Sequence, residues 1–263
     1  MKIPGISGMA ILKSGRLLAT DMINCNLLLF ELTNNSLLFS LSMPRYPWGI
    51  AVLDNHVVAV TCPPLGIMVV LSTIGDKLFK DKEIEIGYCC RGIVRLKDQL
   101  VVSYGHPNSG VKLLDIDGTV LKEFINPNHD NGSPVLQEPW YMTLDETSGS
   151  IIVSEAVKPV LVIYDICGEV KEIFRLKSPS NIKSPRGLTK GPEGYCFLSG
   201  FVASVVSLVS IKTKDVYNLL CETDGICCPA STIYDDKTQT FYVGQHLLEG
   251  EDRGVIKAFS LKR

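Results

Sequence analysis

The apolar residues of this chain fall in short runs that are separated by turn sequences rich in Gly, Pro, Asn and Asp. The most regular runs are "RLLAT", "HVVAV", "QLVVS", "SIIVS", "YCFLS" and "TFYVG". Runs of this length that are rich in β-branched residues and bounded by turn residues predict β-strands. No segment keeps a helical period over three turns, so the pattern predicts an all-β fold.

The strand pattern repeats along the chain. Equivalent stretches read "SGMAIL", "WGIAVL", "RGIVRL", "WYMTLD", "RGLTKG" and "PASTIY", and they begin at Ser7, Trp48, Arg91, Trp140, Arg186 and Pro229. The second residues of these stretches are Gly8, Gly49, Gly92, Tyr141, Gly187 and Ala230, and successive ones are 41 to 49 residues apart. A repeat of this length that contains only strands is typical of a β-propeller.

Each unit contains an opening strand, a buried second strand, a third strand such as "VLVIYDI" and a fourth such as "EVKEIFRL". The pairs Asp117-Gly118 and Cys167-Gly168 lie between third and fourth strands, where a tight hairpin favours positive φ. The sequence therefore predicts one domain over residues 1–263, an all-β six-bladed β-propeller with four-stranded antiparallel blades. The second strands should be the most buried, since neighbouring blades cover both of their faces.

The last unit ends at Arg263 without a fourth strand. The stretch Met1 to Ile6 is a poor but possible substitute for that strand, because it contains Pro4 and Gly5. We therefore expect the natural protein to extend upstream of Met1.

The composition narrows the choice of partners. Apolar residues make up 46% of the chain, charged residues make up 21%, and the net charge is −2 with a pI near 6.1. This balance does not indicate a polyanion partner. The chain has no apolar run long enough to span a bilayer and no secretory leader at Met1. We expect a cytoplasmic protein with no membrane partner.

The cysteines and histidines do not form a ligand pattern. The nine cysteines include adjacent pairs at Cys89-Cys90 and Cys227-Cys228, and adjacent cysteines bond each other poorly. There are four histidines and no Cys-x-x-Cys pair, and the nearest approach to a cluster is Cys221 with Cys227-Cys228. We expect no disulfide, no metal and no cofactor.

A family resemblance is carried by "SPRGLTKGPEGYCFLSG", "VLVIYDICGEVKEIF" and "VKLLDIDGTVLKEF". These stretches resemble NHL repeats, and the chain is especially similar to the C-terminal propellers of tripartite-motif proteins. The resemblance implies a propeller that selects protein substrates for a RING ubiquitin ligase. This chain has no RING or B-box cysteine pattern, so ligase activity would belong to residues outside it. Some propellers of that family bind single-stranded RNA, which is the alternative implied partner.

An enzymatic function is tested by the strand-opening positions. Lactonase-type six-bladed propellers resemble this fold and hold a metal in the channel with several converging oxygen ligands. Here those positions carry no acid, and Glu138 is one lone carboxylate where a set is required. There is no Gly-x-Ser-x-Gly elbow and no phosphate-binding glycine loop. We therefore predict a protein that is not an enzyme, with a lactonase-like metal-dependent hydrolase as a second alternative.

The residue that begins each unit defines a column that should surround the channel mouth. Both tryptophans of the chain, Trp48 and Trp140, fall in this column together with Arg91 and Arg186. Indole and guanidinium groups offer flat, weakly hydrated surfaces that can stack on bases or hold a peptide. The alternative is that the two indole rings simply pack between blades. If both arginines are on the surface, Arg91→Glu with Arg186→Glu should abolish binding and leave the fold intact.

Loops on the same face carry further candidate binding residues. The basic and aromatic candidates are Arg45, Tyr46, Lys158, Arg175, Lys177 and Lys183. The acidic candidates on the other side are Glu222, Asp224, Glu249, Glu251 and Asp252. Such a divided face suits a protein or peptide partner, and its basic half suits single-stranded RNA. The long polar loop Asn126–Pro134 is a further candidate. Salt dependence of binding separates the two partner classes.

Overall fold

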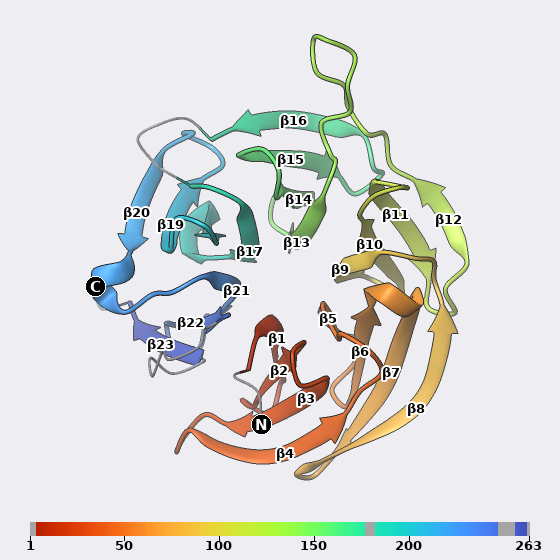
Figure 1. Ribbon diagram of the computed structural model, residues 1–263, viewed down its shortest axis with the longest axis vertical. Helices are drawn as coiled ribbons and strands as arrows, with labels where there is room; N and C mark the ends of the chain where they lie inside the picture. Colours follow the sequence, from red (N-terminus) through yellow and green to blue (C-terminus); the bar gives the residue numbers. More distant parts are fainter. Residues whose placement is uncertain (1–3, 177–181, 247–255, 262–263) are drawn as a thin grey trace.

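The computed structural model describes residues 4–176, 182–246 and 256–261, which form six antiparallel sheets around a central channel (Figure 1). The first three blades are β1 (Ile6–Ile11), β2 (Leu17–Asp21), β3 (Asn26–Glu31) and β4 (Ser36–Ser42); β5 (Ile50–Val52), β6 (Val57–Cys62), β7 (Ile67–Ile74) and β8 (Lys77–Glu85); and β9 (Cys90–Leu96), β10 (Gln99–Tyr104), β11 (Gly110–Asp115) and β12 (Val120–Glu123). The other three are β13 (Pro139–Asp145), β14 (Ser150–Glu155), β15 (Val160–Asp165) and β16 (Val170–Arg175); β17 (Pro185–Lys190), β18 (Tyr195–Gly200), β19 (Val205–Ser210) and β20 (Val216–Leu220); and β21 (Pro229–Asp235), β22 (Thr240–Gln245) and β23 (Ile256–Ser260).

The predicted fold class is confirmed: the protein is an all-β six-bladed propeller. Every blade is an up-and-down meander whose first strand lines the channel and whose last strand lies outside. Five blades have four strands, and the described residues of the last blade supply three. Helical structure in the described chain is limited to the short 3-10 turns η1 (Pro63–Leu65), η2 (Pro192–Gly194) and η3 (Glu222–Asp224). No described helix has the length and apolar character needed to cross a membrane.

The second strands are the buried layer of each blade, as predicted. All residues of β2 and β14 are buried, and in β6, β10, β18 and β22 only the first residue is partly exposed. Adjacent blades cover both faces of these strands, so near-continuous apolar runs are stable there. The core is therefore a ring of clusters between blades rather than one central mass.

Glycine after the column residue lets neighbouring inner strands approach closely. A Cβ atom on Gly49 would lie 2.5 Å from the carbonyl oxygen of Arg91, and one on Gly92 would lie 2.8 Å from that of Trp140. The first three blades thus contact the backbone of the column residue in the next blade, since a Cβ on Gly8 would likewise meet the carbonyl oxygen of Trp48. The "WG" and "RG" pairs of the sequence follow from this packing, because only glycine leaves room for it.

Hydroxyl groups on the second strands fix the same carbonyl groups. Thr61 donates its hydroxyl hydrogen bond to the carbonyl of Arg91 at 2.6 Å. Equivalent bonds join Thr20 to Trp48 at 2.7 Å and Ser154 to Arg186 at 3.0 Å. Buried hydroxyls need such partners, and here the partner is the backbone that presents a candidate binding residue. The second strands therefore fix the main chain of these column residues through hydrogen bonds.

The N-terminal stretch does not supply the missing fourth strand. Gly5 forms a β-bridge with His246, and Ile6 begins β1 at the channel. The possibility that Met1 to Ile6 substitutes for this strand does not hold from Pro4 onward, while residues 1–3 lie outside the described residues. The hydrophobic pattern could not show this, because Ile6 suits an inner strand and an outer strand equally well.

Candidate functional site at the channel mouth

Four column residues meet at one end of the channel, on the face that carries the loops between second and third strands. The rings of Trp48 and Trp140 pack edge to face with centroids 5.2 Å apart. The guanidinium of Arg186 lies 3.9 Å from the Trp140 ring centroid, and that of Arg91 lies 4.9 Å from it. Trp48 lies just before β5, and the other three lie in β9, β13 and β17, so the closed ring brings residues of four blades together. We call Trp48, Arg91, Trp140 and Arg186 the mouth cluster.

Glu138 is the acidic partner of this cluster. Its carboxylate forms an ion pair with Arg91 and accepts a hydrogen bond from the indole nitrogen of Trp140 at 3.3 Å. The backbone N–H of His106 also points at this carboxylate, at 3.4 Å. Glu138 therefore orients an arginine and a tryptophan. Among the described residues no three His, Cys, Asp or Glu side chains lie close enough to hold a metal ion.

Arg186 contacts two aromatic rings. Its guanidinium carbon lies 3.3 Å from the ring centroid of Phe201 and 3.9 Å from that of Trp140. Burial lowers the pKa of Arg186 to about 10, which still leaves it charged at neutral pH. Cation–π contacts of this kind compensate for lost hydration. The premise that both arginines are free surface residues is wrong, because Arg186 is enclosed and Arg91 is ion-paired.

The rings of Trp48 and Trp140 are partly packed against the core and partly exposed. Both rings are half-buried and lie against the apolar cluster between the fourth and fifth blades. Trp48 reaches across the channel to Tyr141, with ring centroids 6.3 Å apart. Tyr141, which replaces the glycine of other units, donates its hydroxyl hydrogen bond to the carbonyl of Ser7 in the first blade. The two readings of the tryptophans, packing and binding, are therefore compatible.

Phe201 and His246 are site residues that the sequence reasoning missed. Their rings are 6.0 Å apart, and His246 bonds its N–H to the carbonyl of Cys228 at 3.1 Å. Burial, followed by the charge of Arg186, lowers the pKa of His246. Each follows the last residue of a second strand, and the six equivalents are Met22, Pro63, Gly105, Ala156, Phe201 and His246. A second column in the same alignment would have found them.

Two donors of the mouth cluster lack partners. The indole nitrogen of Trp48 and the Nε atom of Arg186 are buried, and neither has a hydrogen-bond partner in the described part of the protein. Both groups can only donate. An unsatisfied buried donor costs about 1–3 kcal/mol, so the site is suited to a ligand with acceptor oxygens.

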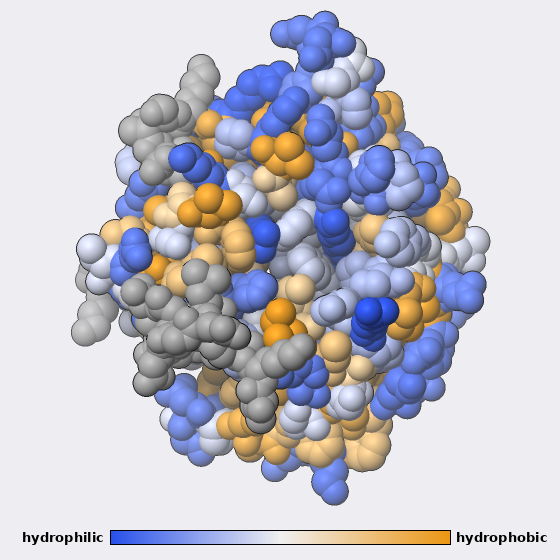
Figure 2. Space-filling model, in the orientation of Figure 1, coloured by the Kyte–Doolittle hydropathy of each residue, from blue (hydrophilic) through white to orange (hydrophobic). Residues whose placement is uncertain are grey.

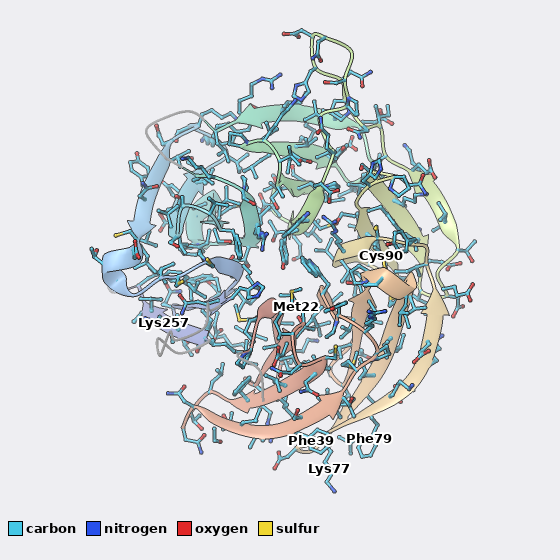
Figure 3. The ribbon with its side chains drawn as sticks, viewed as in Figure 1. Met22, Phe39, Lys77, Phe79, Cys90 and Lys257 are labelled. Carbon is cyan, nitrogen blue, oxygen red and sulfur yellow. The ribbon has the colours of Figure 1, made fainter. Side chains whose placement is uncertain are left out.

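An aromatic cavity adjoins the cluster. It has a volume of about 240 Å³ and is bordered by Trp48, Arg91, Tyr46, Tyr88 and Met22. Tyr88 is 60% exposed and Tyr46 is 38% exposed, so both rings are available to a partner. Figure 3 shows Met22 beside the channel, and Figure 2 shows hydrophilic and hydrophobic residues interspersed around the centre of the same view. The cavity thus shares Trp48 and Arg91 with the mouth cluster.

The other predicted rim residues divide into separate groups. Arg45 lies 5.7 Å from the ring of Tyr46, at the cavity. Arg175 and Lys158 instead lie near His129 in the long loop, where Arg175 Nη1 is 3.4 Å from His129 Nδ1. Lys183 is exposed just before β17.

Four of the predicted rim residues cannot be placed. Lys177, Glu249, Glu251 and Asp252 lie outside the described residues. Glu222 and Asp224 belong to η3, before β21. The division of this face into a basic half and an acidic half stays a prediction.

Comparison with known proteins identifies the fold. No protein-family model and no curated protein sequence matches the chain. Among solved structures it is similar to a catalytically inactive histidine-to-alanine variant of virginiamycin B lyase from Staphylococcus aureus, solved with quinupristin. The identity is 13%, the match covers 98% of this chain and 84% of that one, and the TM-score is 0.63.

Two further similar structures have different functions. A nidogen/laminin complex matches at 17% identity over 81% of this chain and 80% of that one, with a TM-score of 0.64. Glutaminyl cyclase from Myxococcus xanthus matches at 14% identity over 75% and 86%, with a TM-score of 0.56. At such identity the likeness shows the fold alone.

These neighbours correct the prediction that the protein is not an enzyme. A lyase and a cyclase share its architecture, and the lyase does so over almost the whole chain. The prediction failed because it tested the channel for lactonase-type metal ligands and for nucleophile motifs only. Those two tests do not cover every kind of enzymatic chemistry, so they could not exclude an enzyme.

Proposed function

We propose that this protein is a partner-binding propeller whose mouth cluster and aromatic cavity hold an exposed segment of another protein. The convergence of Trp48, Arg91, Trp140 and Arg186 supports this function most directly. Trp, Tyr and Arg dominate the binding energy of protein interfaces. The nidogen/laminin structure supports it further, since a propeller of this architecture takes part in a protein complex.

The chemistry of the site defines the segment that would fit it. The cavity of about 240 Å³ accepts one large apolar or aromatic side chain. Beside it, Glu138 forms an ion pair with Arg91, and Arg186 has an unpaired donor among the described residues. A carboxylate on the ligand would supply the acceptor that is missing. The expected segment therefore carries an acidic group next to an aromatic or large aliphatic residue. If the resemblance to tripartite-motif propellers extends to function, the bound protein would be a ubiquitination substrate.

Catalysis on a bound molecule is a second candidate function of the same site. The lyase neighbour loses activity when a histidine is replaced, and this chain places His246 at its own channel mouth. The lowered pKa of His246 keeps its imidazole neutral near pH 7, as a general base requires. His246→Ala would then abolish turnover while a ligand still binds.

The binding function can be tested with a defined probe, a displayed library of random twelve-residue peptides. Selection on the protein should enrich peptides that pair an acidic residue with an aromatic one. Tyr88→Ala should weaken the best peptide at least about tenfold without changing Tm, because Tyr88 is exposed. Trp48→Ala should weaken binding and also lower Tm, because its ring packs against the core. Tyr217→Ala, which removes a similarly exposed ring on β20, is the matched control.

Three results would contradict the proposal. The first is a failure to enrich any peptide, and the second is equal loss of affinity in the Tyr88 and Tyr217 variants. The third is preferential binding of a single-stranded RNA oligonucleotide with a steep salt dependence, which would assign the face to nucleic acid. Mass spectrometry of recovered peptides distinguishes simple binding from chemical conversion.

A further inference from the structure

The last blade has an open outer edge within the described residues. β23 pairs with β22 on its inner side, in a one-to-one antiparallel register from Ile256 to Ser260. The N–H of Leu261 donates to the carbonyl of Gln239 at 2.9 Å. Because bonded and non-bonded pairs alternate in an antiparallel ladder, the backbone groups of Ile256, Ala258 and Ser260 point outward. No other described strand pairs with them.

The other five blades show what normally occupies this position. Each has a fourth strand, and these strands form the outer circle of the ring (Figure 1). Every fourth strand, or the residue beside it, places an apolar side chain in the cluster shared with a neighbouring blade. These side chains are Leu41, Ile84, Phe124, Phe174 and Leu220. The fourth strand is therefore part of the seal between blades.

At the junction of the last and first blades, the described residues supply no such strand, and an apolar groove lies between them. The groove has a volume of about 580 Å³, and its walls include Leu28, Phe30 and Leu37 from the first blade and Tyr242, Ile256 and Ala258 from the last. Leu37 is 53% exposed. Two of the residues with outward backbone groups, Ile256 and Ala258, thus also line the groove. Among the described residues, unpaired backbone groups and exposed apolar side chains therefore occur at the same place.

We propose that an extended segment of a partner polypeptide binds here as the fourth strand of the last blade. Its backbone would pair with Ala258 and Ser260, and every second side chain would enter the groove. The partner is a strand rather than a helix, because only an extended chain satisfies the outward groups of β23. Its inward side chains are apolar, as those of the five fourth strands are. The chain from Gly5 to Ile6 cannot be the occupant, since both residues pair elsewhere.

The probe is a synthetic peptide that copies a fourth strand of this same chain, residues 169–176, "EVKEIFRL". Added to the full chain, it should slow hydrogen exchange of the Ala258 and Ser260 amides at least about tenfold. The Lys257 and Phe259 amides, which face β22, are the internal reference and should change less. A peptide with proline in place of its second glutamate, equivalent to Glu172→Pro, loses a backbone donor and should not bind.

A variant of the groove tests the side-chain contribution. Leu37→Asp introduces charge at an exposed position, so the chain should fold and bind the peptide at least about fivefold more weakly. Leu121→Asp, at a site that is 49% exposed on β12, is the matched control and should bind normally.

The proposal is overturned if saturating peptide leaves the Ala258 and Ser260 amides unchanged, or if the two leucine variants bind equally. It is also overturned if these amides are protected without peptide. Protection in a dimer, detected by sedimentation, would assign the groove to a second copy, and protection in a monomer would assign it to the chain itself. The mouth variant Tyr88→Ala should bind this peptide normally, which separates the two sites.

Discussion

The two faces of the propeller differ in how much their residues vary from one blade to the next. On the face away from the mouth, Asp115 accepts hydrogen bonds from the N–H groups of Asp117 and Thr119 at 3.0 and 2.8 Å. One blade later, Asp165 accepts from Cys167 and Glu169 at 2.8 and 2.9 Å. The turn chemistry is thus repeated almost unchanged. On the mouth face, the equivalent positions of successive blades carry serine, tryptophan and arginine side chains instead.

The difference lies in what holds the backbone. A tight turn between two outer strands depends on its own side chains, so Asp115 and Asp165 cannot vary freely. At the mouth, a buried carboxylate from a second strand fixes the main chain by hydrogen bonds. The carboxylate of Glu155, fully buried at the end of β14, accepts hydrogen bonds from Gln137, Glu138 and Val157 at 2.8 to 2.9 Å. The side chains at the mouth therefore do not have to fix the main chain, and they can differ from blade to blade.

We expect the largest effect from a substitution that disturbs the close packing of the inner strands beneath the mouth. Gly49→Ala would place a methyl group 2.5 Å from the carbonyl oxygen of Arg91. We expect a loss of about 2–3 kcal/mol in the free energy of unfolding, or roughly 5–10 °C in Tm, together with weaker binding at the mouth. Gly110→Ala is the matched control, because its Cβ would meet no atom within 4 Å. Equal Tm values for the two variants, measured by calorimetry, would show that close approach of inner strands is not required.

The backbone architecture could be predicted from the sequence more completely than the contacts of the side chains at the mouth. The number of blades and the burial of the second strands were predicted from the apolar runs and the recurrent glycines, because both features depend on local periodicity. The alignment also placed Trp48, Arg91, Trp140 and Arg186 around one opening. It could not show that Arg186 would be enclosed by Phe201, since that contact joins residues through ring closure. Exposure of an arginine is a property of the assembled ring.

A turn on the opposite face should affect stability without affecting the mouth. Asp165→Ala removes the acceptor of two backbone N–H groups, and we expect a loss of about 1–2 kcal/mol in the free energy of unfolding. Affinity for a mouth-selected peptide should stay within about twofold of the original. Asp98→Ala, at a side chain that is 99% exposed, controls for the loss of a carboxylate and should leave Tm nearly unchanged. A large loss of peptide affinity in Asp165→Ala would mean that the two faces are coupled.

The smallest expected effect concerns the pH range in which the mouth responds. Burial and the charge of Arg186 lower the pKa of His246, while Asp21 acts in the opposite direction. The unfolded chain therefore binds a proton near pH 6.5 that the folded chain does not, so stability falls as pH decreases below that value. His246 is only half-buried, and we expect its replacement in His246→Asn to reduce the fall in Tm between pH 7.5 and 5.5 by about 1–2 °C. His56→Asn, which removes an exposed histidine between β5 and β6, should leave the slope unchanged. A slope in His246→Asn as steep as in the original protein would mean that another group carries the response, and His129, whose pKa is also lowered, would be the next to replace.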